Sequence, residues 1–323
     1  MTSAASDREL EAHLGLVERE ILAGRVVPFL GAGANLCGRP QGVTWEFGQF
    51  DWLPSGKELS RYLAQAFDYR EENDDLVRVS EYVSLTAGPR PLYDELRQLF
   101  DGDYPPTELH RFLARLPSIL RERHPEAPPY QLIVTTNYDD VLERAFREAG
   151  EPFDLVTYDA EGPYRGKFTH RPHQGQPTTI HEPNSYSDLT TSKRTVILKI
   201  HGAVDRENED RDSYVITEDD YIDYLARTDV SALFPATLVR ILRRSHCLFL
   251  GYSLRDWNLR VILNRIWGEE RLRSQSWSIQ LTTDRLDRLL WNRRDVQIFE
   301  IPLEQYIATL RTRLLEPAQA GGE

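Results

Sequence analysis

Short apolar runs that alternate with helical patterns dominate this sequence and constrain its fold more than any other feature. The predicted strands are the runs 26–30, 131–135, 153–158, 195–200, 247–252, 277–281 and 296–301. Helical patterns follow most of them, at 139–149, 218–226, 232–245, 256–267, 284–294 and 303–315. Strands that alternate with helices form a mostly parallel sheet with helices on both faces. We therefore expect an α/β fold that is Rossmann-like and doubly wound.

A block of helical patterns interrupts this alternation between residues 55 and 116. The separate patterns cover 55–69, 76–86, 92–100 and 107–116, with proline-containing breaks between some of them. Ser55 followed by Glu58 is typical of a capping box at a helix start. We expect the block to be a helical subdomain inserted into the α/β domain.

The remaining boundaries follow from composition. We expect an N-terminal helix within residues 1–24, one α/β domain over 25–316 and a flexible polar tail over 317–323. A polar stretch over 161–193, with scattered glycine, proline and serine, is expected to be a long loop. The 323 residues suit one large domain with insertions or two compact units of roughly 150 residues each.

The charge balance limits the partners of the chain. Lysine and arginine number 39 and aspartate and glutamate 51, which gives a net charge of −12. We therefore expect no direct contact with nucleic acid or an anionic membrane. The N-terminus is not typical of a signal peptide and no run approaches the ~18 apolar residues of a membrane span, so we expect a cytoplasmic protein.

The two cysteines exclude some classes of site. Cys37 and Cys247 cannot build a disulfide framework or a four-cysteine zinc site. Both follow or begin apolar runs, so we expect buried free thiols. His170, His173 and His181 lie in the polar stretch without the spacing of metal ligands, and we expect no metal.

A glycine turn follows the first predicted strand. Gly31, Ala32 and Gly33 let the backbone pass close to a diphosphate, and Asn35 is a possible further contact. The third glycine of the dinucleotide fingerprint is missing, which weakens a dehydrogenase interpretation. The alternative is a tight strand-to-loop turn without a ligand.

Polar residues follow the second predicted strand. Thr136, Asn137, Tyr138 and Asp139 stand between this strand and a helix, where ligands bind in open α/β sheets. The alternative is helix capping, above all by Asp140, because asparagine and aspartate are preferred caps. Capping explains the whole cluster less well than a ligand site does.

Two later strand ends complete the set. His201, backed by Gly202, is well placed as a general base, although a strand-end histidine is more often a structural residue. Gly251 and Ser253 suit contacts with a ribose or adenine; the alternative is a strand-to-helix turn capped by Ser253. We expect all four strand ends to converge in one crevice.

Taken together, these segments resemble a sirtuin-like domain. The glycine turn at 31–33, Thr136-Asn137-Tyr138-Asp139, His201-Gly202 and Gly251-Tyr252-Ser253 occur in that family's order and approximate spacing. The resemblance covers residues 25–301, and the segment 213–225 is similar to the prokaryotic branch. Sirtuin deacylases carry a zinc ribbon with paired cysteines that this chain lacks. The chain is more similar to sirtuin-like effector domains of bacterial antiphage systems, which hydrolyse NAD.

The resemblance implies a role for each candidate residue. NAD would be the substrate, cleaved to ADP-ribose and nicotinamide. Asn137 would hold the water and the nicotinamide-side ribose, Asp139 would contact the nicotinamide side or orient the Asn137 loop, and His201 would accept a proton. Three groups of residues would bind the remainder of NAD, namely Gly31, Ala32, Gly33 and Asn35 at the diphosphate, Thr136 beside Asn137, and Gly251 and Ser253 at the adenosine half.

Two other functions and several partners stay open at this point. An NAD-dependent protein deacylase would use the same chemistry, and a non-catalytic sensor would bind NAD or ADP-ribose without turnover. The resemblance implies a homo-oligomer or a separate partner chain, such as a HerA-type ATPase or a short Argonaute-type sensor. Four aromatic residues in one loop either cover the crevice or contact another subunit, namely Trp45, Phe47, Phe50 and Trp52.

Overall fold

A computed structural model describes residues 3–71, 75–226, 233–253, 257–267 and 275–315. The tail expected at 317–323 lies outside the described residues. Within these ranges, no helix combines the length and the apolar character needed to cross a membrane.

A nine-stranded sheet forms the centre of the described structure. Its strand order is β11-β10-β9-β1-β2-β6-β3-β4-β5. The bounds are β1 Val26–Leu30, β2 Leu132–Thr135, β3 Phe153–Asp159, β4 Lys167–Arg171, β5 Thr178–Ile180, β6 Thr195–Lys199, β9 His246–Leu250, β10 Ser276–Gln280 and β11 Val296–Glu300. All neighbouring pairs are parallel except β3 with β4 and β4 with β5. The α/β fold with a mostly parallel sheet is therefore confirmed.

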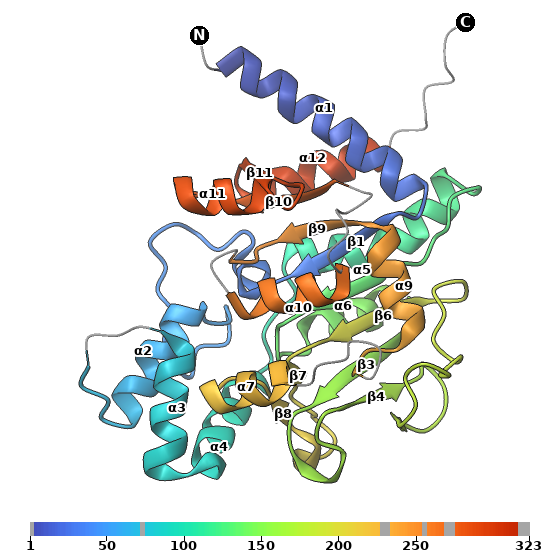
Figure 1. Ribbon diagram of the computed structural model, residues 1–323. Helices are drawn as coiled ribbons and strands as arrows, with labels where there is room; N and C mark the ends of the chain where they lie inside the picture. The colour runs from blue at the N-terminus through green and yellow to red at the C-terminus, as the bar shows by residue number, and fades with distance from the viewer. Residues whose placement is uncertain (1–2, 72–74, 227–232, 254–256, 268–274, 316–323) are drawn as a thin grey trace, which may run out of the picture.

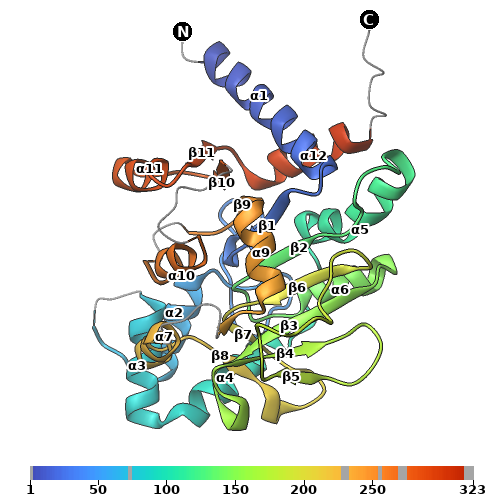
Figure 2. The same ribbon diagram turned by 45° about the vertical axis from the view of Figure 1, so that its right-hand side comes forward.

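Helices cover both faces of this sheet (Figures 1 and 2). On one face lie α1 Ser3–Leu22, α5 Glu108–Arg123, α6 Val141–Ala149 and α12 Leu303–Leu315. On the other lie α7 Glu218–Ala226, α9 Ala236–Arg244, α10 Trp257–Trp267 and α11 Arg285–Asn292. The alternation of side chains along a strand produces the two cores, since Val27 and Phe29 enter one core and Val26 and Leu30 the other. The doubly wound arrangement is confirmed.

Three helices share a third core beside the sheet. They are α2 Gly56–Ala66, α3 Leu76–Ala87 and α4 Pro89–Phe100. The predicted capping box is confirmed, because Ser55 accepts from the backbone N–H of Glu58 and Glu58 accepts from that of Ser55. Tyr138, Val204 and Tyr214 join this core from the C-terminal ends of the strands and the segment beyond β6. The three helices thus pack beside the strand ends at which the site was predicted.

Helix α5 lies elsewhere, although the predicted block 55–116 includes its first half. It runs to Arg123, with Pro117 inside it, and packs on α6 and α12 over the sheet. Its first turn is joined to the β1 turn, because the hydroxyl of Thr107 donates to the carbonyl of Ala34 at 3.1 Å. The helices of the block therefore divide between two cores.

The expected long loop at 161–193 was wrong in part. Residues 167–180 contain the antiparallel strands β4 and β5, which extend the sheet beyond β3. Every second side chain of β4 is buried, including Phe168 and His170, while Lys167 and Arg171 are only half-buried. An edge hairpin with one exposed face needs few apolar residues, so its composition is that of a loop.

Candidate functional site

The four predicted segments leave the sheet at one level. Leu30 at the end of β1 pairs with Thr135 of β2 and with Leu250 of β9, and Thr135 in turn pairs with Lys199 of β6. The chain runs from β1 toward β2 on one side and reaches β9 on the other only later, so the order of strands reverses at β1. Ligands of open α/β sheets bind at such a switch point, outside the carboxyl ends of the strands.

The glycine turn packs directly against the turn after β9. The N–H of Gly33 donates to the carbonyl of Gly251 at 2.8 Å. A Cβ atom on Gly33 would lie 2.6 Å from that oxygen, and one on Gly251 would lie 2.2 Å from the nitrogen of Ala34. Gly251 also has a φ of 64°, which side chains rarely adopt. This contact supports the tight-turn interpretation, and Ala32 is the exposed residue at its tip.

Asn137 connects the loop after β2 with the glycine turn. Its Nδ2 donates to the carbonyl of Gly31 at 3.2 Å, and its own N–H donates to Oγ1 of Thr135 at 3.0 Å. The N–H of Thr136 donates to the carbonyl of Leu30 at 3.2 Å. The side chain of Asn137 is half-buried, so it is held in place and still reaches solvent.

Asp139 is buried and serves the loop itself. Its Oδ2 accepts from Nδ2 of Asn35 at 2.8 Å, and its Oδ1 accepts from the N–H of Val141 at 3.1 Å, in the first turn of α6. These bonds favour the loop-orienting role over direct contact with nicotinamide. Asn35 is buried in the same pair rather than placed at the turn surface.

Asp140 does not cap α6 with its side chain, so that interpretation was wrong. Its carboxylate pairs instead with Arg206 at 2.9 Å and with Arg144 at 3.2 Å. The acceptor that α6 uses is Asp139, one residue earlier. The capping interpretation therefore holds for Asp139, whose carboxylate also holds Asn35. The ligand-site interpretation of the cluster stays a prediction.

His201 lies at the end of β6, beside the Asn137 loop. Because Thr135 pairs with Lys199, Asn137 and His201 each stand two residues beyond a paired position. The imidazole is buried; its Nδ1 lies 3.5 Å from the hydroxyl of Tyr221 on α7, and the two rings meet edge to face. Gly202 follows with a φ of 86°, and a Cβ atom there would lie 2.1 Å from the carbonyl of Ser213. The glycine lets the chain turn away and leaves the histidine between β6 and α7.

The end of β9 is only partly described. Gly251 is half-buried against the glycine turn and Ser253 is exposed. The next residues, 254–256, lie outside the described part, so the capping role of Ser253 stays a prediction. Hydrogen bonds join Asn137 to Gly31, Gly33 to Gly251 and Asn35 to Asp139. Thr136 and His201 stand on the neighbouring strand ends, and Ala32 and Ser253 are exposed at the turn tips.

Sequence reasoning missed a buried ion pair under the Asn137 loop. Lys199, the last residue of β6, is fully buried, and its Nζ lies 2.8 Å from Oε1 of Glu143 on α6. The same Nζ donates to the carbonyl of Asp139 and, at 3.4 Å, to that of Tyr138. The available signal was a lysine at the end of an otherwise apolar run, directly before His201.

A cavity of about 910 Å³ lies over β3–β5, apart from the glycine turn. Its lining includes Tyr93 and Arg97 of α4, Asp159 of β3 and Arg171 of β4. Burial raises the pKa of Asp159 to about 6, although its carboxylate accepts from the hydroxyl of Thr169 at 2.7 Å. None of the predicted site residues lines this cavity.

Within the described ranges, no three histidine, cysteine, aspartate or glutamate residues are grouped to hold a metal ion. Both cysteines are free and buried, as expected, and burial raises the pKa of Cys37 to about 11 and that of Cys247 to about 12. Neither thiol is therefore a nucleophile at neutral pH.

Comparison with known families shows to which family of doubly wound folds the chain belongs. Residues 131–299, slightly more than half of the chain, match the model of the SIR2-like domain. The chain belongs to the SIR2-like family. The matched range of this SIR2-like chain runs from the start of β2 to β11 and includes Asn137, His201 and Gly251.

Several curated proteins are similar to this SIR2-like chain. The NAD(+) hydrolase ThsA of Enterococcus faecium is 30% identical over 203 residues, which are 62% of this chain and 33% of the relative. The NAD(+) hydrolase ThsA of Acinetobacter baumannii is 28% identical over 251 residues, 77% of this chain and 42% of the relative. Defense-associated sirtuin 2 of Bacillus subtilis is 23% identical over 244 residues, 75% and 19% respectively. The chain spans less than half the length of each of these relatives.

Proposed function

We propose that this SIR2-like chain hydrolyses the bond between nicotinamide and ribose in NAD. The observation that carries the proposal is the alignment of Asn137 and His201 on neighbouring strand ends at the switch point, with the glycine turn beside them. The names of two relatives, NAD(+) hydrolase ThsA, support the same substrate.

The proposed reaction requires little acid catalysis from the protein. Nicotinamide is attached to C1′ as a cation, so the C–N bond breaks with its electron pair moving to nitrogen and nicotinamide leaves neutral. The site must stabilise the ribosyl cation that remains and must position a water molecule against it. Water adds to C1′, and loss of one proton completes ADP-ribose.

Each candidate residue has a part in this proposal. Asn137, held by Gly31, presents its amide oxygen to the water and the ribose. His201 accepts the proton from the water or from a ribose hydroxyl. Asp139 keeps the loop in shape through Asn35 and Val141. The exposed turn tips at Ala32 and Ser253 would face the diphosphate and the adenosine half, together with Gly31, Gly33, Thr136 and Gly251.

The biological setting is also a proposal. Relatives that carry the names NAD(+) hydrolase and defense-associated sirtuin support a role as an effector of antiphage defence that depletes NAD. We propose that the chain acts in the cytoplasm as a homo-oligomer, or docked on a separate HerA-type ATPase or short Argonaute-type chain. Its net charge of −12 leaves nucleic-acid contact to such a partner. We also propose that no metal takes part.

The decisive test is nicotinamide release from NAD by purified protein. Asn137→Ala and His201→Ala should each lower the rate by about 10²–10³, because each removes a polar group that acts on the transition state. His246→Ala is a matched control, since His246 begins β9 and lies at the amino ends of the strands, away from the predicted site at their carboxyl ends. Near-wild-type rates in both site variants would refute the catalytic assignment.

The same assay separates the two alternatives. A protein deacylase needs an acylated peptide before it consumes NAD, so turnover with NAD alone supports the hydrolase. A sensor would bind NAD or ADP-ribose, measured by calorimetry, without releasing nicotinamide. The presence of Asn137 and His201 at equivalent positions after neighbouring strands favours the enzyme, because binding alone does not require both groups.

A further inference from the structure

The strongest unexplained feature is the buried lysine at the end of β6. Lys199 is fully buried and Glu143 almost so, and neither takes part in the reaction proposed above. Burying such a pair removes two charges from water, a cost that mutual attraction often fails to recover. Replacing a buried ion pair by well-packed apolar residues is often neutral or stabilising, so stability is a weak reason for a lysine here.

The acceptors of Lys199 indicate what it does. An ammonium group has three hydrogens to donate, and three oxygens surround this one. Two of them are the backbone carbonyls of Tyr138 and Asp139, and the third is the Glu143 carboxylate. The carbonyls belong to the two residues directly after Asn137. Glu143 of α6 fixes the position of the ammonium group. Lys199, at the end of β6, in turn holds the loop through the two carbonyls.

The position of Lys199 in the sheet adds a second constraint. It pairs with Thr135, the last residue of β2, and lies two residues before His201. The N–H of Ile200, between them, donates to the carbonyl of Thr135 at 3.0 Å. Lys199 thus connects the loop that contains Asn137 with the strand that precedes His201.

Resting on the function proposed above, we propose that Lys199 is a positioning residue that sets the geometry between Asn137 and His201. Its ammonium group holds the carbonyls of residues 138 and 139 and thereby directs the Asn137 side chain toward the reacting carbon. Lys199 touches no substrate in this scheme and acts only through the loop. A displacement of about 1 Å at such a loop is enough to lower a rate about 10²-fold.

The test variant is the double substitution Lys199→Met with Glu143→Gln, which removes the tether without leaving a buried unpaired charge. Glu143→Gln alone is the comparison that retains Lys199 and both carbonyl bonds. Because it leaves the ammonium group without its carboxylate, its stability is measured beside that of the double variant. We expect kcat to fall about 10–100-fold in the double variant while KM for NAD changes little. Lys199→Arg, which keeps donors and charge, should recover part of the loss.

Hydrogen–deuterium exchange of the peptide spanning residues 135–142 supplies a readout that needs no activity. We expect faster exchange there in the double variant than in Glu143→Gln, at a temperature where both are folded. A folded double variant with wild-type kcat would overturn the proposal, whatever its exchange rate. If that variant does not fold, Lys199→Gln with Glu143→Gln replaces it, because the shorter amide cannot reach both carbonyls and no unpaired charge stays buried. A wild-type kcat in this variant would overturn the proposal in the same way.

The two proposals fail in different ways. If the wild-type protein releases no nicotinamide, the proposed function is refuted, and the exchange experiment still shows whether Lys199 holds the loop. If the wild-type protein is active and the double variant has the same kcat, the positioning role is refuted and the proposed hydrolase activity stands.

Discussion

At the scale of single residues, the glycines at the strand ends are explained by the approach of two backbones. Gly33 and Gly251 contact each other through main-chain atoms, and no side chain fits between them. The carbonyl of Gly31 from the same turn also accepts the Asn137 amide. The turn therefore acts on the site through the position of its backbone.

Gly33→Ala should be destabilising by about 1–3 kcal/mol, because its new Cβ would lie 2.6 Å from the Gly251 oxygen and must push the turns apart. Nicotinamide release should fall with it, since the carbonyl that holds Asn137 belongs to the displaced turn. Gly15→Ala is the control: it lies inside α1 with open space around its Cβ, and should stabilise by about 0.5–1 kcal/mol. Urea unfolding measures both, and a Gly33→Ala protein as stable as the wild type would contradict the close-approach argument.

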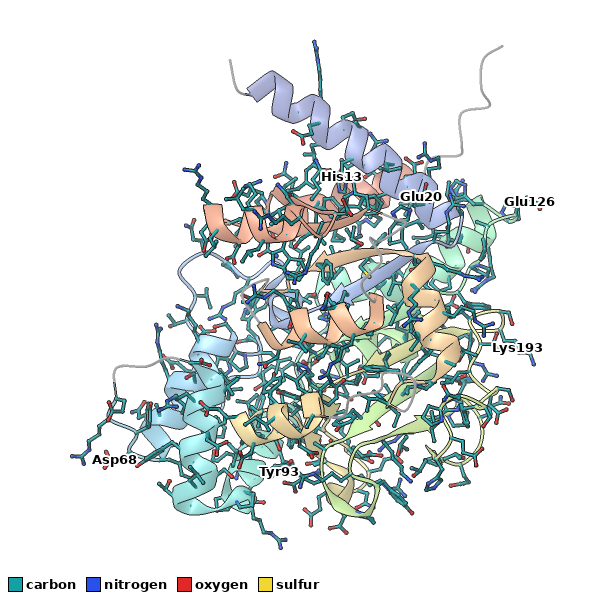
Figure 3. All side chains as sticks on the ribbon, in the orientation of Figure 1. His13, Glu20, Asp68, Tyr93, Glu126 and Lys193 are labelled. Atoms are coloured by element: carbon teal, nitrogen blue, oxygen red, sulfur yellow. The ribbon has the colours of Figure 1, made fainter. Side chains whose placement is uncertain are left out.

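At the scale of elements, α1 is joined to the sheet through a buried histidine (Figure 3). Nε2 of His13 lies 3.0 Å from the hydroxyl of Tyr306 on α12, and its ring stacks on Phe299 of β11 with centroids 3.9 Å apart. Burial lowers the pKa of His13 to about 4. Docking of α1 therefore depends on a neutral imidazole.

This depressed pKa predicts a loss of stability in acid. The unfolded chain binds the proton near pH 6.5 and the folded chain only near pH 4, so the contribution is complete above 6.5 and is lost as the pH falls toward 4. The loss should be about 3 kcal/mol from this residue by pH 4. His13→Gln should flatten the curve of unfolding free energy against pH in that window, whereas His173→Gln, at an exposed position, serves as control. Burial lowers the pKa of His110 to about 4 as well, so the unfolding free energy of His13→Gln should still fall in part with pH. If its dependence on pH equals that of the wild type, His13 is not the source of the acid sensitivity.

At the scale of the whole molecule, the aromatic loop before α2 is only partly absorbed by the fold. Phe47 stacks on Tyr62 and Phe50 meets Tyr104 edge to face, yet 45% and 47% of these phenylalanines stay exposed. Trp45 packs against the core of the three helices, and Trp52 is half-buried. Because large exposed apolar side chains often mark interaction sites, we propose these two phenylalanines as the residues of this loop that contact another subunit.

Light scattering at micromolar concentration tests assembly. We expect a mass above the 37.4 kDa of one chain, and a shift toward one chain in the variant Phe47→Ser with Phe50→Ser. The exposed Leu85→Ser on α3 is the comparison for loss of apolar surface elsewhere. A strictly monomeric wild type with full NAD turnover would contradict the oligomer.

The sequence by itself determined the elements and the family. Strand and helix patterns are local, because they depend on the period of apolar side chains and on caps such as Ser55 with Glu58, so the sheet and its helices could be predicted. The order of the strand-end motifs along the chain was likewise enough to indicate a sirtuin-like domain.

Only the tertiary structure decided which of the polar residues bind one another. Asn35 and Asp139 were both candidates, but their hydrogen bond joins positions 104 residues apart and depends on β1 lying beside β2. Lys199 escaped notice because its three acceptors come from a loop and a helix more than fifty residues earlier. The β4–β5 hairpin was missed because pairing with β3, and no local pattern, makes a polar stretch into strands. Local periodicity sets secondary structure, whereas partners distant in the chain are set by topology, which no short stretch of sequence contains.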